Sequence, residues 1–206
     1  MSQISDIIGA GGKGRPGPLR TFMPAHLILA MITLENTSHI SRQHLADALG
    51  LGSGAVRTLL KNLSDEQLVE SNTSGCYLSS TGKKAVERLN RKLSKLVQLG
   101  PSNLTIGSNQ VAVAVRRSAE KLTNGISQRD SAIVIGASGA TTFAIEDGMF
   151  VMPGGSSDCE RDFPGPAWTI LKNELIPKNG DAVILCGATS DRSAKLGALA
   201  AAMTLL

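Results

Sequence analysis

Five small or polar residues in the segment 53–61 have the chemistry to read a DNA groove. They are Ser53, Gly54, Arg57, Thr58 and Lys61. Their spacing of one, three, one and three residues places them together on one face of a helix. An arginine can donate two hydrogen bonds to a guanine edge, whereas a lysine pairs with a phosphate as a point charge. The pattern predicts a helix face that contacts DNA.

Two helices joined by a short turn must position that face. Ser41 can cap the first helix, which carries Arg42 as a further expected DNA contact and ends at Gly50. The second helix starts near Ser53, and its inner side is apolar: Ala55, Val56, Leu59, Leu60 and Leu63. This order predicts a helix-turn-helix, whose second helix enters a major groove. The blander alternative is an ordinary pair of helices packed in a larger core.

A hairpin is expected directly after these helices. Leu68–Ser71 and Cys76–Ser79 are short extended runs, and the turn-rich segment between them contains Asn72, Thr73 and Ser74. We expect these three residues to contact DNA from a wing. Another helix, starting at Pro24, is predicted to support the module.

The order of helix, turn, helix and hairpin resembles the winged-helix family of transcription regulators. The segment GLGSGAVRTLLKNLSDEQLVES is similar to archaeal members of that family. The resemblance implies sequence-specific binding of double-stranded DNA by residues 21–80.

Charge is divided unequally along the 206 residues. Residues 1–100 contain 12 Lys+Arg and 7 Asp+Glu, a net charge of +5, whereas residues 101–206 contain 9 and 10, a net charge of −1. This surplus suits a phosphate-binding half, although a solvated surface would also explain it. Residues 1–20 are rich in glycine and include Lys13, Arg15 and Arg20. They read as a flexible basic arm that either follows DNA or is an unstructured leader.

Composition excludes several classes of protein. Apolar residues make up 42% of the chain and charged residues 18%, as in globular proteins. The sequence contains no long apolar run and no signal-peptide pattern, so we expect a cytoplasmic protein that makes no membrane contact. Its three cysteines are far apart and all three histidines lie in the N-terminal half, so we expect no disulfide framework, no metal site and no cofactor.

The segment 81–100 is predicted to be a linker helix with an apolar stripe. The stripe has heptad spacing and consists of Val86, Leu89, Leu93 and Leu96. The helix either pairs with its twin in a homodimer or packs back on its own chain. Dimerisation is the favoured hypothesis because paired half-sites suit helix-turn-helix regulators.

A second domain is expected from residue 101 to residue 206. Its predicted order is strand, helix, strand, strand, helix, strand and a terminal helix, with a hairpin turn at Asp147-Gly148. This order favours an α+β sandwich of the ferredoxin-like type, βαββαβ, with helices covering one side of an antiparallel sheet. Ser131–Ala137 is ambiguous between the end of a helix and a buried strand.

Two stretches of small residues in this domain could approach a ligand. The expected contacts are Arg129, Ser138, Gly139, Thr141, Thr142, Thr189 and Ser190. Free amides at a helix start attract anions, so a small anionic effector is the predicted ligand. Tight turns and close packing would also explain these residues.

The likeness extends into this domain. Three segments resemble the uncharacterised C-terminal domain of an archaeal winged-helix family. They are GISQRDSAIVIGASGATTF, EDGMFVMPG and GDAVILCGATSDRSAKLGALAAAMTL. The resemblance implies a DNA reader followed by a domain that senses a ligand or assembles subunits. The sequence shows no catalytic triad and no paired carboxylates with a supporting base, so no enzyme is predicted. A fused enzyme of nucleotide or phosphate metabolism and a purely structural dimer remain the alternatives.

Overall fold

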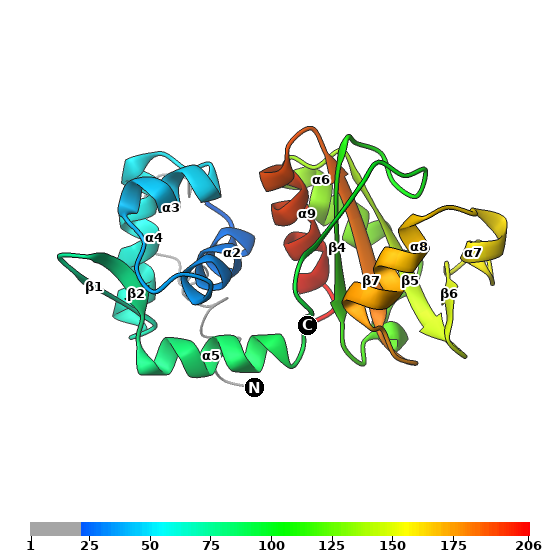
Figure 1. Cartoon of the computed structure of the whole chain (residues 1–206), viewed down its shortest axis with the longest axis horizontal. Helices are drawn as coiled ribbons and strands as arrows, with labels where there is room; N and C mark the ends of the chain where they lie inside the picture. Colours follow the sequence, from blue (N-terminus) through cyan, green and yellow to red (C-terminus); the bar gives the residue numbers. More distant parts are fainter. Residues whose placement is uncertain (1–21) are drawn as a thin grey trace. The chain divides into compact units, whose positions relative to one another are not determined.

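Three helices open the described part of the chain. The computed structural model describes residues 22–206, so the predicted basic arm at residues 1–20 lies outside it. The helices are α2 (Pro24–Glu35), α3 (Arg42–Leu49) and α4 (Ser53–Asp65) (Figure 1). The Ser41 hydroxyl accepts a hydrogen bond from the His44 amide, and Gly50 ends α3 with φ of 65°. The predicted helix-turn-helix is confirmed at both of these boundaries.

A two-stranded hairpin follows the helices, as the sequence predicts. Strand β1 (Val69–Asn72) pairs antiparallel with β2 (Gly75–Leu78). Ile40 forms an isolated bridge with Cys76 and thus adds the loop before α3 to the hairpin. Gly75 has φ of 132°, and a Cβ there would collide with the backbone of Ile40. The unit is therefore winged-helix-like, and its hairpin is anchored to the body of the unit.

The helix after the hairpin is shorter than predicted. Helix α5 (Ser80–Asn90) is capped by the Ser79 hydroxyl, which accepts a hydrogen bond from the Gly82 amide at 2.9 Å. It does not continue to Leu99, so the prediction of one helix over 81–100 is wrong. Leu93 instead forms a bridge with Val115, and β3 (Val97–Leu99) pairs with the next strand. Leu93 and Leu96 fit the heptad, whereas Leu93, Val97 and Leu99 are separated by even numbers of residues as in a strand, and strand pairing decides between these patterns.

The described residues form two compact units, which divide between Leu89 and Asn90. The second unit begins about ten residues before the predicted boundary because the segment after α5 belongs to its sheet. That sheet has five antiparallel strands in the order β3-β4-β7-β5-β6. The other four strands are β4 (Asn109–Val115), β5 (Gly139–Glu146), β6 (Met149–Val151) and β7 (Ala182–Ala188).

Helices cover both faces of this sheet. Helices α6 (Ile126–Val134) and α9 (Asp191–Met203) pack on one face (Figure 1). The other face packs against α7 (Cys159–Asp162), α8 (Ala167–Ile170) and a π-helical turn, Leu171–Leu175. On that side the Phe143, Phe150 and Trp168 rings meet with centroids 5.0–5.9 Å apart.

The ferredoxin-like expectation is wrong, although the antiparallel sheet is confirmed. In a ferredoxin-like sheet the first and third of the four predicted strands would be neighbours, but β6 pairs only with β5 at the edge. The helices also occupy two faces rather than one. The sequence could not distinguish these topologies because β4 and β7 are buried on both sides, so their apolar pattern does not indicate which strands are their neighbours. Ser131–Ala137 is largely the end of α6, so its alternative reading as a strand is wrong.

Candidate nucleic-acid interface

Helix α4 has a buried side and an exposed side, as the sequence predicts. Val56, Leu59, Leu60 and Leu63 are buried. All five residues of the predicted DNA-reading face are exposed: Ser53, Gly54, Arg57, Thr58 and Lys61. The apolar side fixes the rotation of the helix, so these five residues face away from the core. We call these five residues the α4 outer face.

The two cations of the α4 outer face have no partner in the described chain. Neither the Arg57 side chain nor the Lys61 side chain makes a hydrogen bond or ion pair with any residue from 22 to 206. Thr58 differs, because its hydroxyl donates to the Gly54 carbonyl at 3.1 Å. It can still accept a hydrogen bond. Arg57 and Lys61 lie one turn apart and keep their full donor capacity for a ligand.

The first turn of α4 is open. Gly52 is the N-cap and provides no side-chain oxygen, unlike Ser41 at the start of α3. A Cβ on Gly52 or Gly54 would meet nothing within 4 Å. The amides of this first turn are therefore accessible, and the positive end of the helix dipole favours an anion such as a phosphate there.

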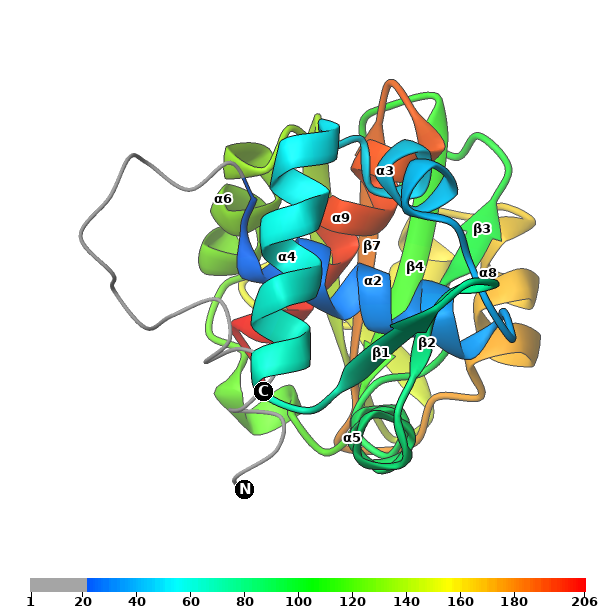
Figure 2. The same cartoon turned by 90° about the vertical axis from the view of Figure 1, so that its left-hand side faces the viewer.

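The hairpin tip has hydrogen-bonding groups but no charge. Asn72, Thr73 and Ser74 are exposed, and the Asn72 Oδ1 accepts from the Ser74 amide at 2.8 Å. Figure 2 shows the hairpin and α4 on the same side of the N-terminal unit. Arg42 is also exposed, at the start of α3. The residues predicted to contact DNA thus come from three neighbouring elements.

The basic surplus of residues 1–100 lies outside the described winged-helix-like unit. Residues 22–89 contain six Lys+Arg and six Asp+Glu, so the described winged-helix-like unit has no net charge. The surplus of the first hundred residues comes from residues 1–21 and from Arg91, Lys92 and Lys95. Because positive charge drives non-specific DNA binding, a unit with no net charge has little electrostatic attraction for a phosphate backbone.

Strand pairing brings the two stretches of small residues in the second unit together. Gly139 on β5 lies opposite Gly187 on β7, and the Ser138 amide donates to the Gly187 carbonyl at 2.8 Å. The space beside Gly187 is filled, because a Cβ there would collide with the carbonyl oxygen of Ile106. The Thr141 hydroxyl donates to the Leu104 carbonyl at 2.5 Å, while Thr142 is buried without a partner for its hydroxyl. Close packing thus accounts for Gly187.

The start of α9 is occupied by the chain's own groups. Ser190 accepts a hydrogen bond from the Ser193 amide at 3.1 Å, and Thr189 is exposed. Asp191 places a carboxylate in the first turn and pairs with Lys195 at 2.6 Å. That carboxylate disfavours a second anion. Arg129 pairs with the neighbouring Asp130 in an exposed ion pair at 3.0 Å. This supports the interpretation that Arg129 belongs to an ordinary surface ion pair rather than to a ligand site.

The proposed dimer seam is not a surface. Val86 and Leu89 are fully buried, and Leu93 is 2% exposed. Leu93 and Leu96 also lie beyond the end of α5, so the four residues do not share a helix face. The prediction of a helical seam at Val86, Leu89, Leu93 and Leu96 is therefore wrong. A homodimer formed by another surface stays a prediction.

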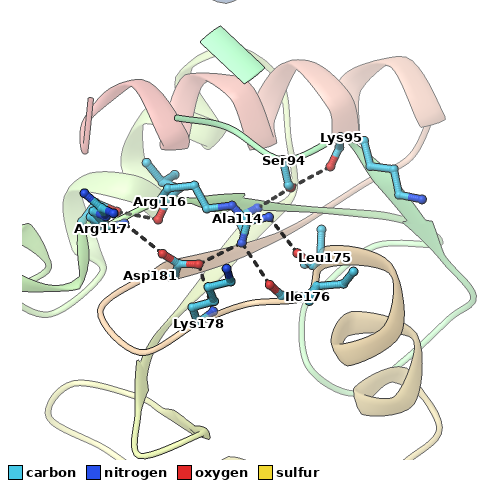
Figure 3. A network of polar contacts seen from close by, with 11 residues as sticks. Ser94, Lys95, Ala114, Arg116, Arg117, Leu175, Ile176, Lys178 and Asp181 are labelled. Atoms are coloured by element: carbon cyan, nitrogen blue, oxygen red, sulfur yellow. Dashed lines mark hydrogen bonds and ion pairs between the residues drawn. The ribbon is translucent and has the colours of Figure 1, made fainter. Parts of the chain in front are cut away.

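A polar network that the sequence did not reveal fastens the second unit (Figure 3). The Asp181 side chain is 3% exposed and accepts hydrogen bonds from the Arg116 guanidinium at 2.8 Å, the Arg117 amide at 2.9 Å and the Lys178 amide at 3.0 Å. Burial alone would raise the pKa of Asp181, but these donors outweigh it and hold the pKa below its ordinary value. Arg116 directly follows a strand and Asp181 directly precedes one, but only the sheet order shows that these strands are neighbours.

The described residues form neither a metal-binding cluster nor a membrane-spanning helix. Between Phe22 and Leu206, no three His, Cys, Asp or Glu side chains gather in a way that could hold a metal ion. None of the helices in this range has both the length and the apolar character needed to cross a bilayer.

Comparison with known proteins identifies relatives of both units. Residues 27–84 match the family described as PH0730-like, N-terminal domain, and residues 106–205 match a domain of unknown function, DUF4443. Among solved structures, the chain is similar to the hypothetical protein PH0730 from Pyrococcus horikoshii OT3, with 25% identity and a TM-score of 0.70 over 88% of this chain and 90% of that one. No curated protein matches the chain. The predicted pairing of a winged-helix-like domain with an uncharacterised domain is confirmed. The descriptions of these families and of the similar structure state no biochemical activity.

Proposed function

We propose that the N-terminal unit binds double-stranded DNA in a sequence-specific manner and that the protein regulates transcription. The observation that carries this proposal is the pair Arg57 and Lys61, exposed and without a partner on the α4 outer face. An exposed helix whose cations have no internal role is suited to a major groove, which admits one α-helix.

Each surrounding feature has a place in this arrangement. Arg57 reads a base edge, and Lys61 and Arg42 contact phosphates. The open first turn at Gly52 and Gly54 receives a phosphate at the amides of Ser53 and its neighbours. The uncharged tip at Asn72, Thr73 and Ser74 adds hydrogen bonds to the sugar-phosphate backbone.

The low charge of the described unit bears on how DNA is bound. With three cations on α3 and α4, non-specific binding is weak and the contribution of base contacts is large. Lys13, Arg15 and Arg20, outside the described residues, supply additional phosphate contacts. We further propose that the second unit senses a ligand or assembles a homodimer, which would align two reading helices with two half-sites.

The test is selection of DNA from a random pool by the full chain, followed by binding measurements on the enriched sequence. The proposal expects one enriched motif, bound more tightly than its scrambled version. Binding that ignores sequence, or no binding at low salt, would contradict it.

A further inference from the structure

A groove of about 780 Å³ opens in the N-terminal unit, and none of the α4 outer face lines it. Its walls come from the end of α2, the loop at residues 36–39, the hairpin and α5. All of these residues lie between 34 and 87, so the groove belongs to this unit alone. Sequence patterns within single elements could not find it, because it is assembled from four separate segments.

Part of the groove lining is apolar and aromatic. Leu34 and Leu78 are buried lining residues, and the His39 and Tyr77 rings lie beside each other with centroids 4.9 Å apart. The polar ends of both rings are occupied. The Tyr77 hydroxyl donates to Glu70 at 2.8 Å, and His39 Nε2 lies 3.2 Å from Asn72 Nδ2. These bonds hold the rings in place and leave their faces as apolar surface.

The lining also includes two opposite charges on α5 that do not pair with one another. Lys83 and Glu87 lie one turn apart on α5. Neither side chain makes an ion pair or hydrogen bond with any residue from 22 to 206. A lysine that precedes a glutamate by four residues is the weaker order for a helical ion pair. Both groups therefore stay available to a ligand.

We propose that this groove binds a free α-amino acid with an apolar side chain. The carboxylate pairs with Lys83, the ammonium pairs with Glu87, and the side chain packs against the rings and Leu78. A phosphate ester fits less well, because Glu35 and Glu87 outnumber the one cation, Lys83. The ligand class thus differs from the anion expected in the second unit.

Regulation follows from the position of the groove, and this step rests on the proposed function. Asn72 and Tyr77 line the groove and belong to the hairpin. A bound amino acid contacts the same element that approaches DNA. If it favours one hairpin geometry, it changes DNA affinity by that difference.

The first experiment uses a spectroscopic property of the chain. Tyr77 is the single tyrosine, so biosynthetic 3-fluorotyrosine gives the full chain one fluorine resonance. We expect a saturable shift of this resonance on titration with L-phenylalanine or L-leucine. The analogues 2-phenylethylamine and 3-phenylpropionate each keep one charge, and each should bind at least about ten-fold more weakly than L-phenylalanine.

Variants locate the ligand. Lys83→Met and Glu87→Gln should each weaken binding at least about ten-fold. Lys84→Met is the matched control, because Lys84 is exposed on the same helix but does not line the groove. It should keep the affinity of the wild type, and thermal unfolding checks that all three variants fold.

Three outcomes would overturn the proposal. They are the absence of a saturable shift with both amino acids, full affinity in Lys83→Met or Glu87→Gln, and equal binding of either single-charge analogue. No DNA is present in these titrations, so their failure leaves the DNA proposal intact. A second titration with the selected DNA tests regulation: a change in DNA affinity with L-phenylalanine supports it, and unchanged affinity at saturation overturns that step.

Discussion

Arg116 Nη1 lies 2.8 Å from Asp181 Oδ2, and this ion pair joins the end of β4 to the start of β7. The same guanidinium donates to the Leu175 carbonyl at 2.8 Å, so it also fastens the π-helical turn. Arg117 and Ile176 adopt positive φ values of 52° and 45°, which cost energy in residues other than glycine. One carboxylate and one guanidinium thus hold two strained turns.

Asp181→Asn should destabilise the second unit by about 2 to 4 kcal/mol at neutral pH, because Arg116 would lose its buried counter-charge. The pKa of Asp181 is lowered in the folded state, so its contribution is present above the pKa of the unfolded chain and lost as pH falls through the folded pKa. The free energy of unfolding of the wild type, measured in urea, should therefore decrease below about pH 4. That of the variant should decrease less over the same range.

Asp130→Asn is the control for this prediction. Its carboxylate pairs with Arg129 at 3.0 Å but is 58% exposed, so solvent already screens it. Equal effects of the two substitutions would contradict the role assigned to Asp181.

Leu93→Lys should unfold or strongly destabilise the second unit rather than dissociate a dimer. Leu93 is 2% exposed and bridges Val115, and burying a lysine there costs several kcal/mol. Sedimentation combined with thermal unfolding checks the outcome. A variant that stays stable but becomes monomeric would instead support the predicted dimer seam.

Tyr77 should ionise at higher pH than a free tyrosine. A hydrogen bond to Glu70 is the main cause of its raised pKa, and the negative charge of that residue adds to it. Because the chain has one tyrosine, alkaline ultraviolet titration reports this residue alone. Glu70→Gln should lower the midpoint, and an unchanged midpoint would show that the contact does not form in solution.

The salt dependence of DNA binding should reveal where the phosphate contacts lie. Arg42 and Lys61, the two cations assigned to phosphates, predict a slope of about −2 in a plot of log affinity against log salt. If Lys13, Arg15 and Arg20 contribute, the full chain should show a slope of about −4.5, and removal of residues 1–20 should reduce it to about −2. Equal slopes for the two proteins would exclude the basic arm from the interface.

Local signals in the sequence predicted the N-terminal unit well. Ser41 and Gly50 define a helix through capping, and the buried row from Val56 to Leu63 fixes which side of α4 is exposed. These effects act within a few residues. The hairpin at Asp147-Gly148 was predictable for the same reason, and β5 and β6 flank it as expected.

Features that depend on distant pairing were not predictable. Leu93 and Leu96 fit a heptad and Leu93, Val97 and Leu99 fit a strand, and the pairing of Leu93 and of residues 97–99 with β4 decides the outcome. The two faces of the sheet, the Arg116–Asp181 network and the groove at His39, Tyr77 and Lys83 each combine residues from separate elements. Their arrangement follows from topology, which residue spacing does not encode.

Substitution on the α4 outer face tests the central claim most directly. The affinity of the full chain for its selected DNA is measured for the wild type, Arg57→Ala, Lys61→Ala and the exposed control Lys84→Ala. Arg57→Ala should cost about 1 to 3 kcal/mol and relax preference at one base pair, whereas Lys61→Ala should weaken all sequences alike. Lys84→Ala should bind as the wild type does. Undiminished binding by the double variant Arg57→Ala with Lys61→Ala would contradict the assignment of α4 as the reading helix.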